Sequence, residues 1–106
     1  MRSPITSNHW NDGDGNPAGG TTFGNGFAIG WQNGPLGRGE NRRPPNGAFV
    51  EDIIAAATER LMWYQESRFA CDENERAIEA LDAALAILED RTKDRETRTV
   101  EGLYVA

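Results

Sequence analysis

The sequence predicts an α+β fold in which a small N-terminal β ribbon precedes a long antiparallel hairpin of two helices. Eleven of the twelve glycines lie at or before Gly47, so turns and loops should dominate the first part of the chain. The nearly glycine-free remainder carries apolar residues at helical spacing on both sides of a short break. A stretch ahead of Gly47 alternates between two faces, as a β-strand does.

Composition divides the chain into residues 1–20, an irregular arm; residues 21–45, the ribbon and a basic, proline-rich loop; and residues 46–106, the hairpin with a C-terminal tail. Asn, Asp, Gly and Pro dominate the arm, where we expect Trp10 to pack as an anchor. The ribbon should pair residues 21–23 with residues 27–32 across a Gly-Asn-Gly turn. Because two strands are not stable alone, the ribbon must rest on the helices or on a second subunit.

The first helix is predicted over residues 48–66, with Glu51 and Asp52 favourably placed in its first turn. Trp63 and Phe69 are interpreted as packing in the core and at the hinge. The apolar stripe of this helix consists of Val50, Ile53, Ile54, Ala57, Leu61 and Tyr64.

The second helix is predicted over residues 72–97, with Asp72 as its N-cap and Glu75 completing a capping box. At 1.5 Å per residue it should be about 40 Å long. Its seam has heptad-like spacing, and alanines beside it allow close helix approach. The seam residues are Asn74, Ile78, Leu81, Leu85, Leu88 and Thr92.

Net charge and motifs exclude several classes of function. The chain carries a formal charge of −6 without an evident basic face, so we expect no binding to duplex nucleic acid. A small anionic ligand remains compatible, because two or three arginines suffice to hold one. The single cysteine, Cys71, rules out an internal disulfide and a multi-cysteine zinc site. No catalytic motif is present, so we predict a protein that is not an enzyme and uses no cofactor or metal.

The chain has neither an apolar run long enough to span a membrane nor a hydrophobic signal core at its start. We therefore expect a cytosolic protein without membrane partners. The hairpin leaves apolar surface with little to cover it, which predicts a homo-oligomer.

Two groups of side chains suit a nucleotide. Tyr64 and Gln65 combine an aromatic face that can stack on a base with an amide that can read its edge. Arg91 and Arg95 lie one helical turn apart and can jointly hold a phosphate. Each group also has a structural interpretation, as hinge packing and as cations complementing the helix dipole, and the residues alone leave both open.

The short break makes the two helices antiparallel, which separates these groups within one chain. The first helix ends with Trp63 and Tyr64 beside Asn74, whereas Arg91 lies beside its start. Axial rise alone places Tyr64 and Arg91 about 25–30 Å apart. A ligand that touches both needs a second chain that runs antiparallel to the first.

Three segments of the chain carry a family resemblance: FAIGWQNGPLG, NGAFVEDIIAAATERLMWYQESRFACDEN and LDAALAILEDRTKDRETRTVEG. In this order, over residues 27–102, they resemble the phage anti-Thoeris signal sponges of the helical-hairpin type, which are related to anti-CBASS cyclic-nucleotide sponges. The first 26 residues match no part of that pattern. The tail TVEGLY at residues 99–104 departs from the family's Gly-Val-Glu-Gly-Thr-His, and isomer preference would change if the tail closes over the ligand.

The resemblance implies a binder without turnover that acts in the cytoplasm of the infected bacterial host. Its ligands would be the cyclic ADP-ribose isomers (gcADPR) made by TIR-domain enzymes, and in some members also cyclic di- or trinucleotides of CBASS at separate sites. It also implies dimers with ligand sites at their interface, which assemble further into hexamers as trimers of dimers.

By motif, the resemblance implies that Tyr64 stacks on adenine, that Asn74 hydrogen-bonds the ligand, and that Arg91 covers the base or binds phosphate. It marks Gln65, Arg95, Trp31 and Asn33 as further ligand-binding positions. Two alternatives stay open at this point. One is a sponge mainly for the cyclic di- or trinucleotides of CBASS, and the other is a non-catalytic helical hairpin that docks a partner protein.

Overall fold

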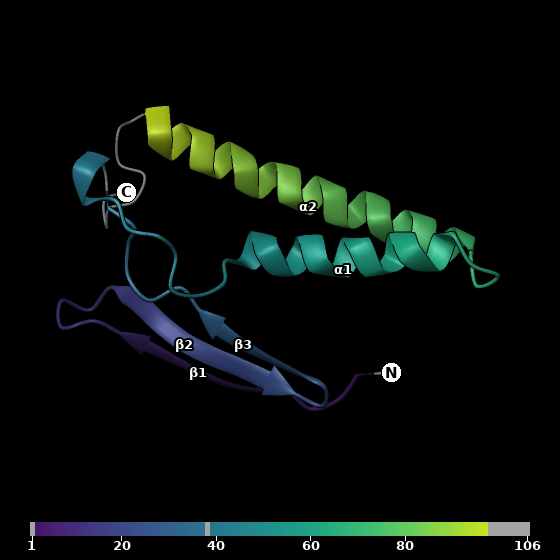
Figure 1. Cartoon of the computed structure of the whole chain (residues 1–106), viewed down its shortest axis with the longest axis horizontal. Helices are drawn as coiled ribbons and strands as arrows, with labels where there is room; N and C mark the ends of the chain where they lie inside the picture. The colour runs from purple at the N-terminus through teal and green to yellow at the C-terminus, as the bar shows by residue number, and fades with distance from the viewer. Residues whose placement is uncertain (1, 38, 98–106) are drawn as a thin grey trace. The chain divides into compact units, whose positions relative to one another are not determined.

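The computed structural model describes residues 2–37 and 39–97, and only the backbone of residues 95–97. It contains two compact units, one extending up to Phe49 and the other spanning Val50–Thr97. The elements are β1 (Thr6–Asn11), β2 (Pro17–Gly24), β3 (Phe27–Trp31), a short 3₁₀ helix (Gly39–Asn41), α1 (Val50–Gln65) and α2 (Asp72–Thr97) (Figure 1). The α+β class and the two-helix hairpin are thus confirmed.

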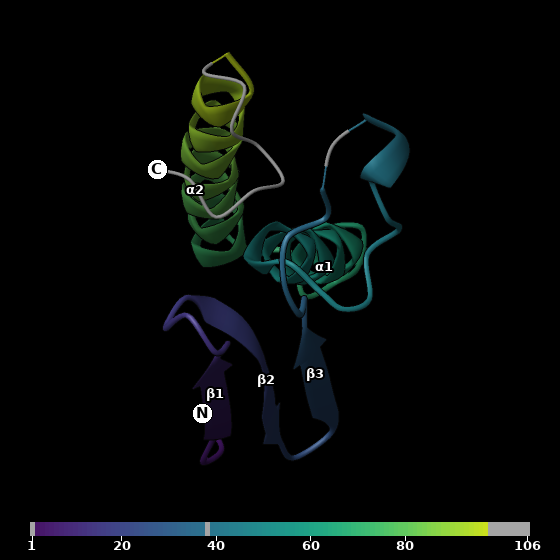
Figure 2. The ribbon, with the colours of Figure 1, turned by 90° about the vertical axis from the view of Figure 1, so that its left-hand side faces the viewer.

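The first unit is an antiparallel sheet in the order β1-β2-β3 (Figure 2). Strands β2 and β3 form the predicted ribbon, in which Thr22 pairs with Ile29 and Phe23 with Ala28. Gly26 lies in the turn between them with a φ of 84°, a backbone conformation that suits glycine. The indole nitrogen of Trp31 donates a 2.8 Å hydrogen bond to the Thr22 hydroxyl on the neighbouring strand.

The prediction of an irregular arm over residues 1–20 is wrong, because β1 pairs with a β2 strand that begins at Pro17. The turn formers make a hairpin connection. One carboxylate oxygen of Asp12 accepts the backbone N–H groups of Asp14 (2.9 Å) and Asn16 (3.1 Å), which turns the chain back on itself. The Trp10 ring lies close to Gly19 on β2, where an added Cβ would meet it, and it stays 49% exposed.

Segment 46–48 lies along the free edge of β3. Ala48 donates its N–H to the Gly30 carbonyl at 2.7 Å and accepts the Gln32 N–H at 2.9 Å. The Asn46 side chain bonds both backbone groups of Asn33, at 2.8 and 3.1 Å. The backbone N–H and carbonyl of Ala48 both bond to the β3 segment and are not part of a helix. Accordingly, α1 begins at Val50, two residues later than predicted.

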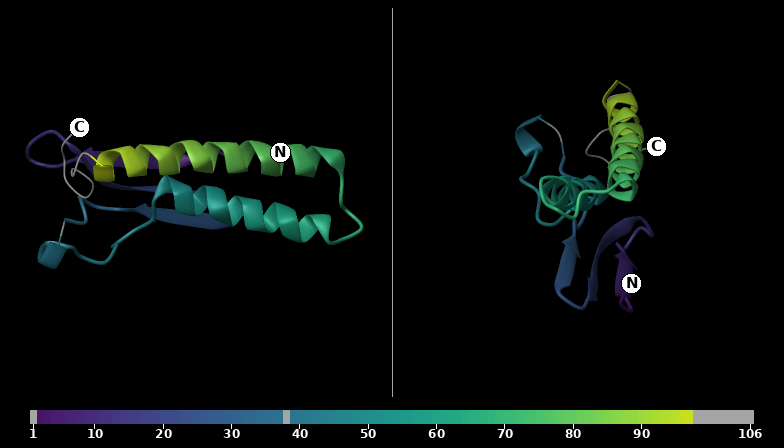
Figure 3. Two further views of the ribbon diagram at one scale, coloured as in Figure 1. Left: turned by 90° about the horizontal axis from the view of Figure 1, so that it is seen from above. Right: turned by 90° about the vertical axis from the view of Figure 1, so that its right-hand side faces the viewer.

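The second unit is the hairpin, whose helices run side by side in opposite directions (Figure 3). The predicted seam of α2 is confirmed, because all six of its residues are half-buried. On α1, Ile53, Ile54 and Leu61 are half-buried as expected, but Val50 and Ala57 are exposed. Thr58 is half-buried in place of Ala57; its hydroxyl is satisfied by a 2.8 Å bond to the Ile54 carbonyl.

No apolar side chain among the described residues is fully buried. Trp63 and Phe69, interpreted from sequence as core and hinge packing, are instead 55% and 63% exposed. They lie off the half-buried stripe, at the end of α1 and in the loop after it. No helix in the described part of the chain is long and apolar enough to cross a membrane.

The cap of α2 differs by one residue from the prediction. Asp72 is the first helical residue, and the preceding Cys71 carbonyl accepts the Glu75 N–H at 3.3 Å. The Asp72 carboxylate binds the Arg76 guanidinium at 2.9 Å and does not form the expected capping box. Together with Glu73 and Glu75, it still places negative charge in the first turn, where the helix dipole favours it.

Candidate functional site

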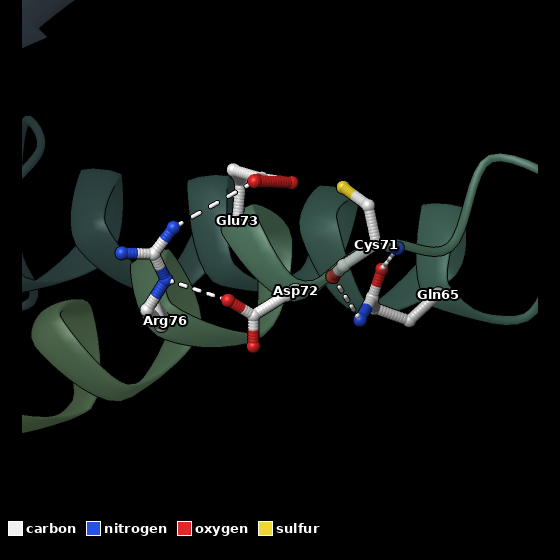
Figure 4. A network of polar contacts seen from close by, with 5 residues as sticks. All are labelled: Gln65, Cys71, Asp72, Glu73 and Arg76. Carbon is white, nitrogen blue, oxygen red and sulfur yellow. Dashed lines mark hydrogen bonds and ion pairs between the residues drawn. The ribbon is translucent and has the colours of Figure 1, made fainter.

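One group of candidate residues gathers where α1 meets α2. Gln65, the last residue of α1, uses both ends of its amide on Cys71: Nε2 donates to the Cys71 carbonyl at 3.1 Å and Oε1 accepts the Cys71 N–H at 3.0 Å (Figure 4). This pair of hydrogen bonds, the Gln65 brace, ties the end of α1 to Cys71, which precedes α2 by one residue and Asn74 by three. Tyr64 and Asn74 are both half-buried.

Polar contacts within the loop also hold this end of the hairpin. The Ser67 hydroxyl donates to the Tyr64 carbonyl at 2.6 Å and accepts the N–H of Phe69 at 3.1 Å. The Arg68 guanidinium lies 5.0 Å from the centre of the Phe69 ring. The backbone that carries Tyr64 is therefore fixed on its C-terminal side by hydrogen bonds and on its N-terminal side by α1 itself.

The Tyr64 ring lies beside a second aromatic ring and a cation. Its centre is 5.4 Å from that of Trp63, with a 54° angle between the planes. The Arg60 guanidinium lies 4.4 Å from the centre of the Trp63 ring and 5.0 Å from that of Tyr64. Its Nε donates a 3.3 Å hydrogen bond to the Tyr64 hydroxyl. A cation on two aromatic rings is a favourable arrangement that limits how the Tyr64 ring can turn.

Arg91 occupies the opposite end of the hairpin. Its guanidinium is 3.9 Å from the carboxylate of Glu51, in the first turn of α1. This ion pair places the Arg91 guanidinium beside the first turn of α1. Tyr64 follows Glu51 by 13 residues, which is about 20 Å of helix axis. The separation of about 25–30 Å between Tyr64 and Arg91, obtained from axial rise, stays a prediction.

The remaining predicted residues lie elsewhere. Arg95 is on the last turn of α2 and its side chain lies outside the described part of the structure, as do Arg98 and the tail at residues 99–104. Trp31 and Asn33 belong to the first unit, where both are held by the contacts given above. Their roles in ligand binding stay predictions. Within residues 2–37 and 39–97, no group of three His, Cys, Asp or Glu side chains is suited to hold a metal ion.

Sequence reasoning missed Arg60 and Glu51. Arg60 precedes Trp63 and Tyr64 by three and four residues, the spacing at which side chains on a helix meet, so that signal was present in the sequence. The pairing of Glu51 with Arg91 joins residues far apart in the chain. Predicting this pair requires knowing which residues of the two helices lie opposite each other, and the sequence does not determine that register to within one residue.

These features define a small helical-hairpin protein with an aromatic and amide group at one end of the hairpin and an arginine at the other. Residues 25–93 match the family model described as "Acb2/Tad1, hairpin domain", and the chain belongs to this family. The matched region contains β3, α1 and most of α2. It leaves out β1 and β2 entirely, the strands that sequence reasoning also failed to connect with the family.

The chain is also similar to the protein named "Thoeris anti-defense 1" from Bacillus phage SBSphiJ7. The two are 41% identical over 76 residues, which cover 72% of this chain and 51% of that protein. This chain therefore spans about half the length of the curated relative it matches. The resemblance to the anti-Thoeris family, drawn from the three sequence segments, is confirmed by these two findings.

Proposed function

We propose that the protein counters Thoeris defence by binding cyclic ADP-ribose signals of the gcADPR type and holding them without degrading them. The family and the name of the phage relative support an anti-Thoeris role. The separation of Tyr64 from Arg91 is the structural observation that supports a bound nucleotide most directly. At one end of the hairpin lies a tyrosine that can stack on a base, and at the other an arginine that can bind phosphate.

The ligand site is formed by two chains. A nucleotide that stacks on Tyr64 does not reach Arg91 of the same chain, because Arg91 pairs with Glu51, about 20 Å of helix axis away from Tyr64. A second hairpin running antiparallel to the first brings its own Arg91 to Tyr64, and the same symmetry creates a second, identical site. Such dimers can assemble further, into a hexamer built as a trimer of dimers.

Each residue has a distinct role in this proposal. Tyr64 stacks on the adenine, a contact that contributes about 1–3 kcal/mol. Asn74 hydrogen-bonds the ligand from the start of α2, and Arg91 of the other chain binds phosphate or covers the base. Supporting roles fall to Gln65, Arg95, Trp31 and Asn33. Of these, Gln65 acts by holding the loop between the helices in place, because its amide hydrogen-bonds the Cys71 backbone.

Sequestration requires no reaction, only affinity. A sponge must hold the signal below the concentration at which the host effector responds. We therefore expect nanomolar dissociation constants, which correspond to about −12 kcal/mol. The place of action is the cytoplasm of the infected bacterium, where TIR-domain enzymes would release the signal.

A thermal-shift panel tests the proposal with the full chain against cyclic ADP-ribose isomers, cyclic dinucleotides and cyclic trinucleotides. We expect the largest stabilisation with an ADP-ribose isomer, and recovery of unmodified ligand after the complex is heated. A hydrolysed product would show an enzyme. Stabilisation by cyclic oligonucleotides alone would point to a sponge against CBASS, and no shift with any nucleotide to a module that docks a protein.

Arg91→Ala provides the matched variant for this panel. The substitution should abolish the ligand-induced shift while leaving the oligomer intact, because the ion pair that Arg91 makes among the described residues, with Glu51, is long and partly exposed. Arg76→Ala is the control, since Arg76 is another exposed arginine of α2, which pairs with Asp72 and Glu73 (Figure 4). An Arg91→Ala variant that binds like Arg76→Ala would contradict the assigned role.

A further inference from the structure

Arg60 contacts the ring of the proposed base-stacking residue Tyr64, and neither the sequence motifs nor the family comparison pointed to it. Its guanidinium lies 4.4 Å from the centre of the Trp63 ring and 5.0 Å from that of Tyr64. The 3.3 Å bond from its Nε to the Tyr64 hydroxyl fixes the side chain on this aromatic pair. Arg60 and Trp63 are both exposed, so a ligand can reach them.

The bonding of Arg60 differs from that of Arg76 and Arg91, the two arginines of α2 whose side chains are described. Arg76 pairs with two carboxylates and Arg91 with one. Within the described part of the chain, Arg60 contacts no carboxylate, and its only hydrogen bond uses Nε. A guanidinium has five N–H groups, so the four on its two terminal nitrogens remain available for an acceptor.

The sequence around Arg60 explains this availability. The residues three and four positions away along the helix are Ala56, Ala57, Trp63 and Tyr64, and none of them is acidic. A helical arginine finds its local carboxylate partner at these spacings, as Arg76 does with Asp72 and Glu73. In a protein with 17 acidic residues, Arg60 therefore has aromatic neighbours where a carboxylate would otherwise neutralise it.

We propose that Arg60 is a further ligand-binding residue, which binds a phosphate of the nucleotide whose base stacks on Tyr64. This inference rests on the proposed function and adds a cation from the same chain as Tyr64. A guanidinium fork matches phosphate oxygens, and its exposed terminal N–H groups provide the donors. The two aromatic rings hold the charge in place before the ligand arrives, which reduces the entropy lost on binding.

A purely structural role for Arg60 makes a different prediction. If Arg60 only orients the Tyr64 ring, its loss weakens stacking of any adenine compound, with or without phosphate. If it binds phosphate, its loss weakens only ligands that carry phosphate. Ligands that share the adenine and differ in phosphate therefore separate the two roles.

The experiment measures dissociation constants of the full chain and of Arg60→Ala, Arg60→Lys and the control Arg76→Ala. The ligands are ADP, adenosine and the ADP-ribose isomer that stabilises the protein most. Dissociation constants of ligands that bind weakly are measured by ligand-detected NMR. We expect Arg60→Ala to lose tenfold or more in affinity for both phosphate-bearing ligands and to keep adenosine within twofold. Arg60→Lys should recover part of the loss, because it keeps the charge but not the fork.

Three outcomes overturn the inference. Arg60→Ala could bind all ligands as Arg76→Ala does, or it could lose equal affinity for ADP and for adenosine. It could also bind the phosphate-bearing ligands more tightly than the unmodified protein, which would mean that Arg60 obstructs the Tyr64 ring. The proposed function fails differently, when the unmodified protein binds no ADP-ribose isomer. In that case an Arg60-dependent affinity for ADP or a cyclic dinucleotide still supports phosphate binding by Arg60, and the lack of any such affinity overturns it.

Discussion

Gln65 shows how a single residue can be recognised in a sequence for one property and used in the structure for another. The sequence leaves open whether its amide reads the edge of a base or packs at the hinge, and in the structure both polar ends bind the Cys71 backbone. No periodicity or motif distinguishes these uses, since each requires the same amide. Tyr64 and Arg91 are candidates by side-chain type alone, because an aromatic ring and a guanidinium suit a nucleotide, and their ligand-binding roles stay predictions.

The brace at Gln65 leads to a stability prediction. Gln65→Ala removes two hydrogen bonds that tie the end of α1 to the start of α2, each of which contributes about 0.5–1.5 kcal/mol. We expect the free energy of unfolding to fall by about 1–3 kcal/mol in chemical denaturation at fixed protein concentration. Glu66→Ala, at the exposed neighbouring residue, is the control and should change it by less than about 0.5 kcal/mol. Equal losses would show that the loop does not depend on the brace.

At the scale of the elements, the helices were predictable and the first strand was not. The α2 seam repeats apolar residues at heptad-like spacing, and that spacing fixes both the helix and its half-buried face. The β1 sequence TSNHWN has no apolar alternation to reveal it, and all of its residues are exposed. The strand exists because the Asp12 turn returns the chain and β2 supplies a hydrogen-bonding partner, which are relations between segments.

Close approach of β1 to β2 depends on Gly20, and this can be measured. A Cβ at position 20 would collide with the carbonyl oxygen of Asn8 on β1, whereas one at Gly30 on β3 would meet nothing within 4 Å. Gly20→Ala should therefore cost about 1–3 kcal/mol of stability and shift the amide NMR signals of β1. Gly30→Ala should leave both unchanged. Similar effects of the two substitutions would contradict the pairing of β1 with β2.

At the scale of the whole molecule, the hairpin leaves apolar surface exposed. Its described residues bury no apolar side chain fully, and Met62, Trp63 and Ile87 are each more than half exposed. Exposed apolar surface of this kind marks interaction sites. The groups proposed to hold the ligand show a matching incompleteness, because Tyr64 and Arg91 lie at opposite ends of the hairpin. A symmetric second copy would resolve both, covering apolar surface and completing two sites at once.

Subunit mixing tests the two-chain site directly. Tyr64→Ala and Arg91→Ala should each abolish binding of the ADP-ribose isomer, because every site of either homodimer lacks one group. In a mixed dimer one site lacks both groups, but the other receives Tyr64 from the Arg91→Ala chain and Arg91 from the Tyr64→Ala chain. Binding should therefore reappear when the two inactive variants are unfolded together and refolded.

The amount of recovered binding is fixed by symmetry. Random pairing of equal amounts makes half of the dimers mixed, each with one intact site where the unmodified dimer has two. Calorimetric titration should thus find about one quarter of the original sites, with the original affinity. The control mixes Tyr64→Ala with the double variant that lacks both Tyr64 and Arg91, and should recover none. A site contained within one chain would give no recovery in either mixture, because each variant chain would carry its own defect.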